Sequence, residues 1–211
     1  MKIIQAARFS GFAFFVAGLF TFFFARTGLR VVGVLLPRQV WVVENAPLWM
    51  AANWLWLLAI FSWMVLLVAL MWSYSPAHRI SSMLQSGLMV ISAVLLIIGV
   101  VLWMNLLPYG AGRENAIDLL AFVDTLVLSL FGAGFFMGGA VSAWIAIDLI
   151  RLDALPRSWM APLILAGACW APSPFLFPRF ELLALGFLLW IGWCLFLGTR
   201  RSLPSAYAEW I

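Results

Sequence analysis

The chain has 211 residues, of which 66% are hydrophobic and 9% charged. Soluble domains contain roughly 45–50% apolar and about 25% charged residues, so this composition excludes a soluble globular fold. The high apolar content also excludes a disordered chain. The 12 Lys and Arg against 8 Asp and Glu give a net charge of +4, but the basic residues are scattered singly. Nucleic acid binding needs a clustered basic face, so we exclude nucleic acid as a partner.

Six stretches with very few charges are each long enough to cross a bilayer. A membrane helix needs roughly 20 apolar residues, and backbone groups in lipid must be satisfied within the segment, which favours helices. We therefore expect an all-α polytopic membrane protein, with one integral membrane domain over residues 1–211 built as a bundle of six transmembrane helices. The predicted spans are 9–25, 48–72, 82–107, 117–149, 159–177 and 181–199.

The segment between the first and second spans, residues 26–47, is not an ordinary loop. It contains two apolar pieces, 31–37 and 40–43, that are too short to span. Charged residues, among them Arg38, lie between and beside them. Short apolar pieces flanked by charge are typical of a helix lying flat in the membrane interface. We expect an interfacial segment here.

The distribution of Lys and Arg predicts the orientation. If the N-terminus is inside, the inner side carries seven basic residues: Lys2, Arg8, Arg79, Arg151, Arg157, Arg200 and Arg201. The outer side then carries five: Arg26, Arg30, Arg38, Arg113 and Arg179. Cytoplasmic loops carry the excess of Lys and Arg, so both termini are expected in the cytoplasm, and we expect the bacterial cytoplasmic (inner) membrane.

Two predicted helices carry small residues at four-residue spacing. The stripe in the first span is Ala13, Ala17 and Thr21, and the stripe in the fourth is Gly134, Gly138 and Ser142. Small residues at this spacing let helix backbones approach closely in lipid. The stripes serve either packing between helices of this chain or docking of a partner subunit.

Tryptophans recur every seven residues in the second span, at Trp49, Trp56 and Trp63. This spacing puts them on one helix face, and a buried indole needs a partner for its N–H. The face therefore packs against another helix or lines a groove for a flat apolar ligand.

Among the polar residues inside predicted spans, Asn53, Asn105 and Asp124 lie toward the outer side in this orientation. A carboxylate within a span costs about 2.5–3.5 kcal/mol and normally faces the interior or a wet cavity. We expect Asp124 to hydrogen-bond to Asn53 or Asn105, or to be protonated. Together with Trp49 and Trp56, these residues form either a candidate small-molecule site or a structural clamp that fixes helix register.

The fifth predicted span contains Pro172 and Pro174, which remove backbone donors and should kink or unwind its outer third. Cys169 and Cys194 have no neighbouring histidine, and His78 is the single histidine of the chain. A metal site, a cofactor and a catalytic triad are therefore not expected. We expect no enzyme.

The stretch 134–170 resembles an uncharacterised bacterial family of six-span membrane proteins. The match lies in the glycine-rich fourth helix, the Leu155-Pro156-Arg157 turn, and the following 163–167 motif. The resemblance covers the C-terminal third of the chain and implies six spans without implying an activity.

The sequence predicts a non-enzymatic accessory or interaction subunit of a membrane assembly. Its partners would be the lipid bilayer and either another membrane protein or further copies of itself. The alternative is a small-molecule binding or transport component, which resembles the substrate-capture subunits of vitamin importers in size and span number. Pigment or quinone binding along the tryptophan face is a third interpretation, without an axial histidine to support it.

Overall fold

The structure is a computed structural model that describes residues 3–31, 35–74 and 80–200, and within these ranges it contains helices joined by short connections and no strand. The elements in chain order are α1 (Ile3–Phe20), η1 (Thr21–Ala25), α2 (Leu35–Glu44), α3 (Ala46–Tyr74), α4 (Ile80–Ala111), α5 (Ala116–Arg151), α6 (Arg157–Trp170), α7 (Ser173–Leu176) and α8 (Glu181–Gly198). Residues 32–34 of the expected interfacial segment lie outside the described residues, as do Lys2, Arg79, Arg201 and His78.

Five helices of the described chain are long and apolar enough to cross a membrane: α1 with its continuation η1, α3, α4, α5 and α8. The prediction of an all-helical, multi-pass membrane protein is therefore confirmed, whereas the number of six spans is not. The expected fifth span is not one membrane-length helix, because α6 has 14 residues and ends at Trp170. The predicted break at Pro172 and Pro174 is confirmed, since only the four-residue α7 follows.

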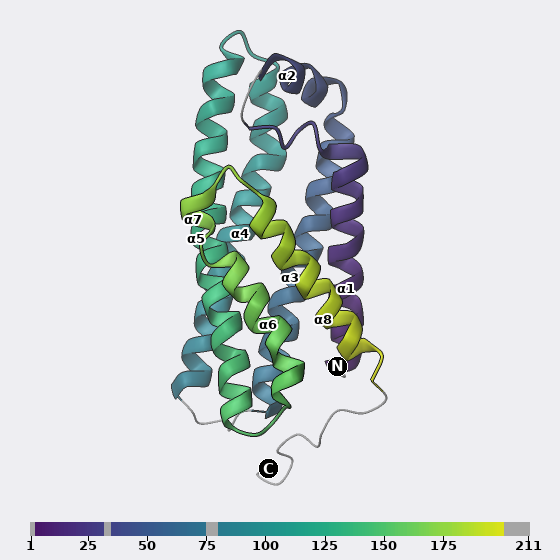
Figure 1. Cartoon of the computed structure of the whole chain (residues 1–211). Helices are drawn as coiled ribbons and strands as arrows, with labels where there is room; N and C mark the ends of the chain where they lie inside the picture. Colours follow the sequence, from purple (N-terminus) through teal and green to yellow (C-terminus); the bar gives the residue numbers. More distant parts are fainter. Residues whose placement is uncertain (1–2, 32–34, 75–79, 201–211) are drawn as a thin grey trace.

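Figure 1 shows how the helices are arranged. The long helices α3, α4 and α5 form one side of an elongated bundle, and α2 lies across one tip, which we call the α2 end. Helix α6 packs along α5, and α8 crosses obliquely from α7 to the far end of α1. The hairpin of α6, α7 and α8 stops well short of the α2 end (Figure 1).

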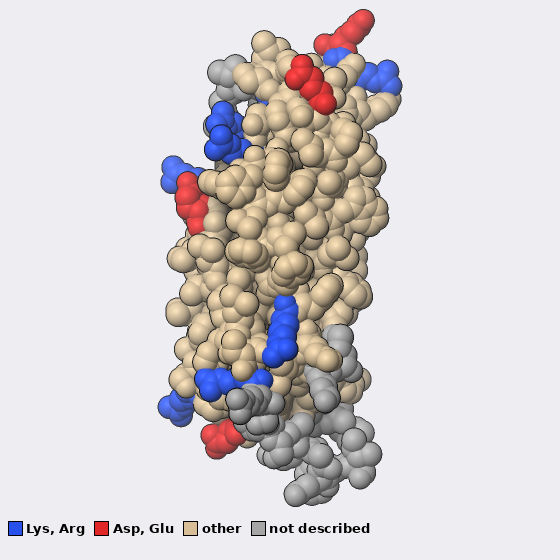
Figure 2. Space-filling view, turned by 90° about the vertical axis from the view of Figure 1, so that its right-hand side faces the viewer, with Lys and Arg blue, Asp and Glu red and all other residues tan. Residues whose placement is uncertain are grey.

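Charged side chains are unevenly distributed along the long axis of the bundle (Figure 2). On the face shown in Figure 2, Lys, Arg, Asp and Glu lie at both tips and also partway along the side, and a band without charge separates the upper groups from the lower ones. Many large apolar side chains face outward from the membrane-length helices, among them Phe12 at 65% exposure and Leu188 at 66%. Such a surface is stable in hydrocarbon and not in water.

The small residues of α5 pack inside the chain. A Cβ built on Gly134 would lie 2.6 Å from Cγ of Leu96 in α4, and one on Gly139 would lie 2.7 Å from the carbonyl oxygen of Gly167 in α6. A Cβ on Gly138 would overlap the ring of Trp63. Ser142 is fully buried, as is Ala17 in α1; Thr21 is also buried and Ala13 is half-buried. Helices of the same chain therefore cover the α5 stripe.

Candidate ligand-binding site

A buried ion pair joins α2 to α5 near the α2 end. Arg38 is 1% exposed and Asp124 is 5% exposed. The Nη2 of Arg38 donates to Oδ1 of Asp124 at 2.7 Å, and Nη1 donates to Oδ2, which makes the contact bidentate. The Nε of Arg38 donates to the carbonyl oxygen of Gly28 at 2.7 Å, so its hydrogen-bonding groups point inward.

Tryptophans extend this pair into the bundle. The Nε1 of Trp103 donates to Oδ1 of Asp124 at 2.9 Å, and the Nε1 of Trp49 donates to the carbonyl oxygen of Trp103 at 3.1 Å. The Nδ2 of Asn53 donates to the carbonyl oxygen of Trp49 at 2.8 Å. A chain of hydrogen bonds therefore runs from α2 through α5 and α4 to α3.

The expected partners of Asp124 are wrong. Its carboxylate meets Arg38 and Trp103, while the Asn53 amide bonds its own helix. Asn105 is exposed and donates to the carbonyl oxygen of Val101 at 2.8 Å, so it is not part of the cluster. The sequence signal for Arg38 is its place among apolar residues, because a charge in such a setting normally pairs with another buried charge.

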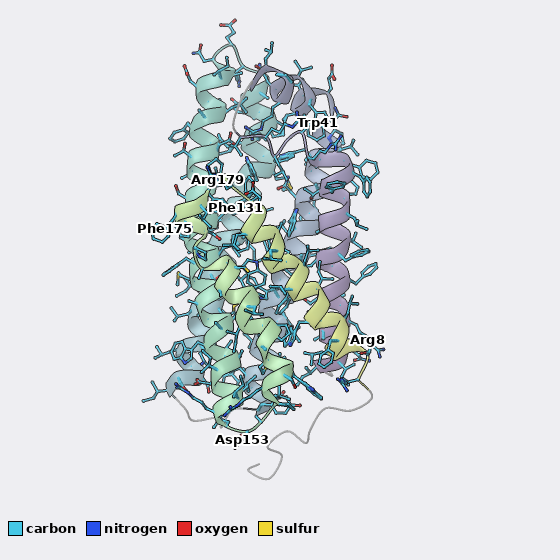
Figure 3. All side chains as sticks on the ribbon, viewed as in Figure 1. Arg8, Trp41, Phe131, Asp153, Phe175 and Arg179 are labelled. Atoms are coloured by element: carbon cyan, nitrogen blue, oxygen red, sulfur yellow. The ribbon has the colours of Figure 1, made fainter. Side chains whose placement is uncertain are left out.

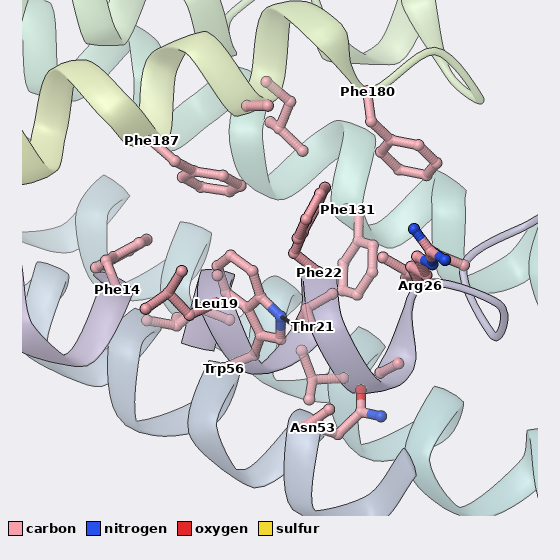
Figure 4. A pocket seen from close by; sticks show the side chains of 18 of the residues that line it. Phe14, Leu19, Thr21, Phe22, Arg26, Asn53, Trp56, Phe131, Phe180 and Phe187 are labelled. Atoms are coloured by element: carbon pink, nitrogen blue, oxygen red, sulfur yellow. Dashed lines mark hydrogen bonds between the residues drawn. The ribbon is translucent and has the colours of Figure 1, made fainter. Parts of the chain in front are cut away.

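A cavity of about 480 Å³, lined in part by Trp49 and Trp103, lies between α1, η1, α3, α4, α5 and α8 (Figure 4). Its wall is almost entirely apolar. Residues from each of these elements line it, among them Thr21, Asn53, Trp56, Val100, Phe131 and Phe187. The cavity includes Asn53, Trp49 and Trp56 of the expected site, whereas Asp124 and Asn105 do not line it.

The oblique course of α8 produces this cavity. Near its C-terminus α8 touches α1, where a Cβ built on Gly11 would lie 2.9 Å from Cβ of Cys194. Near its N-terminus it follows α7, which is held on α5 where a Cβ built on Gly132 would lie 3.2 Å from Cα of Pro174. Helices α1 and α8 therefore diverge toward the α2 end (Figure 1), and the space between them remains open as the cavity.

The opening faces the side of the bundle. Phe22 of η1 and Leu188 of α8 both line the cavity, and they are 61% and 66% exposed on the apolar surface of the molecule. Arg26, which directly follows η1, lies at the end of the cavity nearest α2, opposite Phe180 (Figure 4). Figure 3 places Arg179, on the turn between α7 and α8, at the level of Phe131 and well below Trp41.

The tryptophan face of α3 is divided between packing and the cavity wall. Trp63 is 1% exposed and packs edge-on against Trp170, with ring centroids 4.9 Å apart. Trp56 is half-buried, lines the cavity, and donates from Nε1 to Oγ1 of Thr21 at 2.9 Å. The tryptophan face of α3 therefore packs against another helix at Trp63 and lines the cavity at Trp56.

No group of three or more His, Cys, Asp and Glu side chains lies together among the described residues. No protein-family model, curated protein or solved structure matches the chain. The resemblance of residues 134–170 to a six-span family stays a prediction. A function for the protein must therefore be inferred from the geometry of the cavity and of the ion pair.

Proposed function

We propose that the protein binds a lipid-soluble small molecule in the cavity between η1 and α8. This is the small-molecule alternative from the sequence, with a site that keeps Trp49, Asn53 and Trp56 but not Asn105 or Asp124. The observation that carries the proposal is an apolar cavity that opens sideways, toward the surface that lipid would cover. Its volume of about 480 Å³ falls within the roughly 300–1,000 Å³ that is typical of ligand pockets.

The position of the opening supports entry from the bilayer. Phe22 and Leu188 flank the opening and belong to the lipid-facing surface. A hydrophobic molecule dissolved in the membrane would reach the cavity without crossing water. Burial of apolar surface against aromatic side chains such as Phe187 and Trp56 would add packing contacts that fluid lipid does not provide.

We further propose six passes, with α6 and α7 as the fifth and α8 as the sixth. Helix α8 has 18 residues and is therefore about 27 Å long, close to the roughly 30 Å of the hydrocarbon core. Arg179 and Glu181 are exposed beside the α7–α8 turn. Because this turn stops short of α2 (Figure 1), the outer surface of the bilayer would dip toward it, so that both charges reach headgroups or water.

Helix α2 suits the membrane interface. It turns Arg38 and Val42 inward and leaves Leu36, Val40 and Val43 exposed, at 61%, 47% and 51%. An apolar outer face on a short helix with a buried charge favours contact with lipid. The N-terminal end of α1 and the C-terminal end of α8 meet at the opposite tip, where Nε of Arg8 donates to the carbonyl oxygen of Gly198 at 2.6 Å. We assign that tip to the cytoplasmic side of a bacterial inner membrane.

The accessory-subunit interpretation is the weaker proposal. It depends on small-residue stripes that a partner could reach, and the stripe of α5 is covered by α3, α4 and α6. No other described surface gives a specific reason for a partner.

Two glycine substitutions test the binding function. Gly18 lines the cavity, and a Cβ built there meets nothing within 4 Å, so we expect Gly18→Leu to occupy part of the space, with circular dichroism to check that the variant folds. Gly192 of α8 has equally open surroundings but does not line the cavity, which makes Gly192→Leu the matched control.

The proteins are extracted from their native membrane in mild detergent and analysed by native mass spectrometry. We expect a bound small molecule on the wild type and on Gly192→Leu, and its loss from Gly18→Leu. No bound mass on the wild type, or a mass that Gly18→Leu retains, contradicts the proposal. A companion protein in place of a small molecule would support the accessory-subunit interpretation.

A further inference from the structure

We propose that the ligand is a single-chain lipid carboxylate, with its carboxylate on Arg26 and its hydrocarbon chain along the cavity. The inference rests on the proposed function and names the class of ligand. Arg26 places a positive charge at one end of the cavity. Arg26 is exposed and lines the cavity at its α2 side, at the same end as Phe180 (Figure 4).

Arg26 has no carboxylate of the described chain to neutralise it. Within residues 3–31, 35–74 and 80–200, the one ion pair is that of Arg38 with Asp124. A guanidinium group offers paired N–H donors that match a carboxylate or a phosphate. A cation at the edge of an apolar cavity therefore complements a ligand with one anionic end.

The remainder of the wall is suited to hydrocarbon. Three of its tryptophans have their N–H groups already engaged: Trp56 donates to Thr21, Trp49 to the carbonyl oxygen of Trp103, and Trp103 to Asp124. They present ring carbon to the cavity. A ligand with several polar groups would find few partners along this wall, whereas an acyl chain needs none.

The shape of the cavity suits an extended chain. The segment that lines it on this side runs from Phe180, directly before α8 and at the Arg26 end, to Ile191 of α8, which is a length of about 16 Å. In Figure 4 the lining side chains extend from Arg26 and Phe180 at one end to Phe14 at the other. A single hydrocarbon chain lying along this direction would have its head group at Arg26.

Charge balance favours a carboxylate over a phosphate monoester. The phosphate of a monoester carries about −1.5 to −2 at neutral pH, and one arginine would leave part of that charge unpaired beside an apolar wall. A carboxylate carries a single charge, which Arg26 alone neutralises.

Photolabelling separates this inference from the proposed function. The probes are palmitic acid carrying a diazirine in its chain and the corresponding fatty alcohol, used with protein in nanodiscs of zwitterionic lipid at mildly alkaline pH. The variants are Arg26→Gln and, as the matched control, Arg179→Gln, since Arg179 is also exposed but does not line the cavity. Adducts are mapped by peptide mass spectrometry.

We expect saturable labelling of cavity residues by the acid, reduced about tenfold or more in Arg26→Gln, because a hydrogen bond to a charged group contributes about 1.5–3 kcal/mol and about 1.4 kcal/mol is tenfold in affinity. Arg179→Gln should label like the wild type, and the alcohol should not distinguish the variants. Equal labelling by acid in the wild type and Arg26→Gln overturns the head-group assignment and leaves the cavity as a binding site. Absence of saturable cavity labelling by either probe overturns the proposed function itself.

Discussion

Arg38 and Asp124, 86 positions apart in the chain, are joined by two side-chain hydrogen bonds in the protein interior. The pair attaches the short helix α2 to the long helix α5, and Trp103 adds a third hydrogen bond to the same carboxylate. It therefore fixes the tip of the bundle directly beside the cavity. The geometry favours the structural clamp among the roles expected for Asp124.

Removing one member of this pair should destabilise the protein strongly. In Arg38→Met the carboxylate of Asp124 loses its buried partner, and breaking a buried ion pair from one side costs about 3–5 kcal/mol. The double variant Arg38→Met, Asp124→Leu removes both charges and should recover most of that loss. Unfolding in detergent, followed by circular dichroism, measures both. A double variant no more stable than Arg38→Met would show that the pair is not what couples these residues.

The indole N–H of Trp103 should contribute separately. Trp103→Phe keeps an aromatic ring against Trp49 but deletes the 2.9 Å hydrogen bond to Asp124. We expect a loss of about 1.5–3 kcal/mol of stability, since the acceptor is charged. Trp72→Phe is the control, because Trp72 is 54% exposed on the membrane-facing surface. Equal stabilities of the two variants would contradict the role given to the hydrogen bond.

The sequence predicted much of the fold and less of the site. Long apolar stretches identified five membrane-length helices because length and hydrophobicity are local properties of the chain. The fifth predicted span is not a single membrane-length helix, because α6 ends before Pro172 and Pro174. Local composition also located Asp124 as a buried polar residue, but not its partner, because Arg38 reaches it only through the return of α2 over the bundle.

The sequence predicted one wall of the cavity, the tryptophan face of α3, but not the cavity as a whole. The cavity depends on the angle of α8, which is set by two distant contacts, Gly11 with Cys194 at one end and Gly132 with Pro174 at the other. Periodicity within one helix carries no information on such an angle. Trp49, Trp56 and Asn53 were placed correctly on one face of a helix, yet the opposite wall comes from η1 and α8.

Close approach of α5 and α6 gives a further prediction. A Cβ on Gly139 would lie 2.7 Å from the carbonyl oxygen of Gly167 and 2.8 Å from the backbone nitrogen of Ala171. Backbone atoms cannot rotate away as a side chain can, so Gly139→Ala should cost about 1–3 kcal/mol through overpacking. At Gly87 of α4 a Cβ meets nothing within 4 Å, so Gly87→Ala should be neutral or slightly stabilising. Thermal unfolding of both variants checks this, and equal midpoints would contradict the packing described.

Cysteine labelling tests the proposed orientation. Glu44 at the end of α2 and Asp153 after α5 are both exposed. Helix α2 lies at one tip of the bundle (Figure 1) and Asp153 at the other (Figure 3). With a membrane-impermeant maleimide on intact cells, Glu44→Cys should react and Asp153→Cys should react only after permeabilisation. The wild type, with Cys169 and Cys194, provides the background. The reverse pattern would invert the orientation and place the α2 end in the cytoplasm.

Binding of a lipid between η1 and α8 can be seen in an electron cryo-microscopy map of the protein extracted together with its native lipids. We predict elongated density in the cavity, beginning at Arg26 and following the wall toward Phe14. A map in which α8 lies against η1 and side chains occupy that space would contradict both the cavity and the ligand assigned to it.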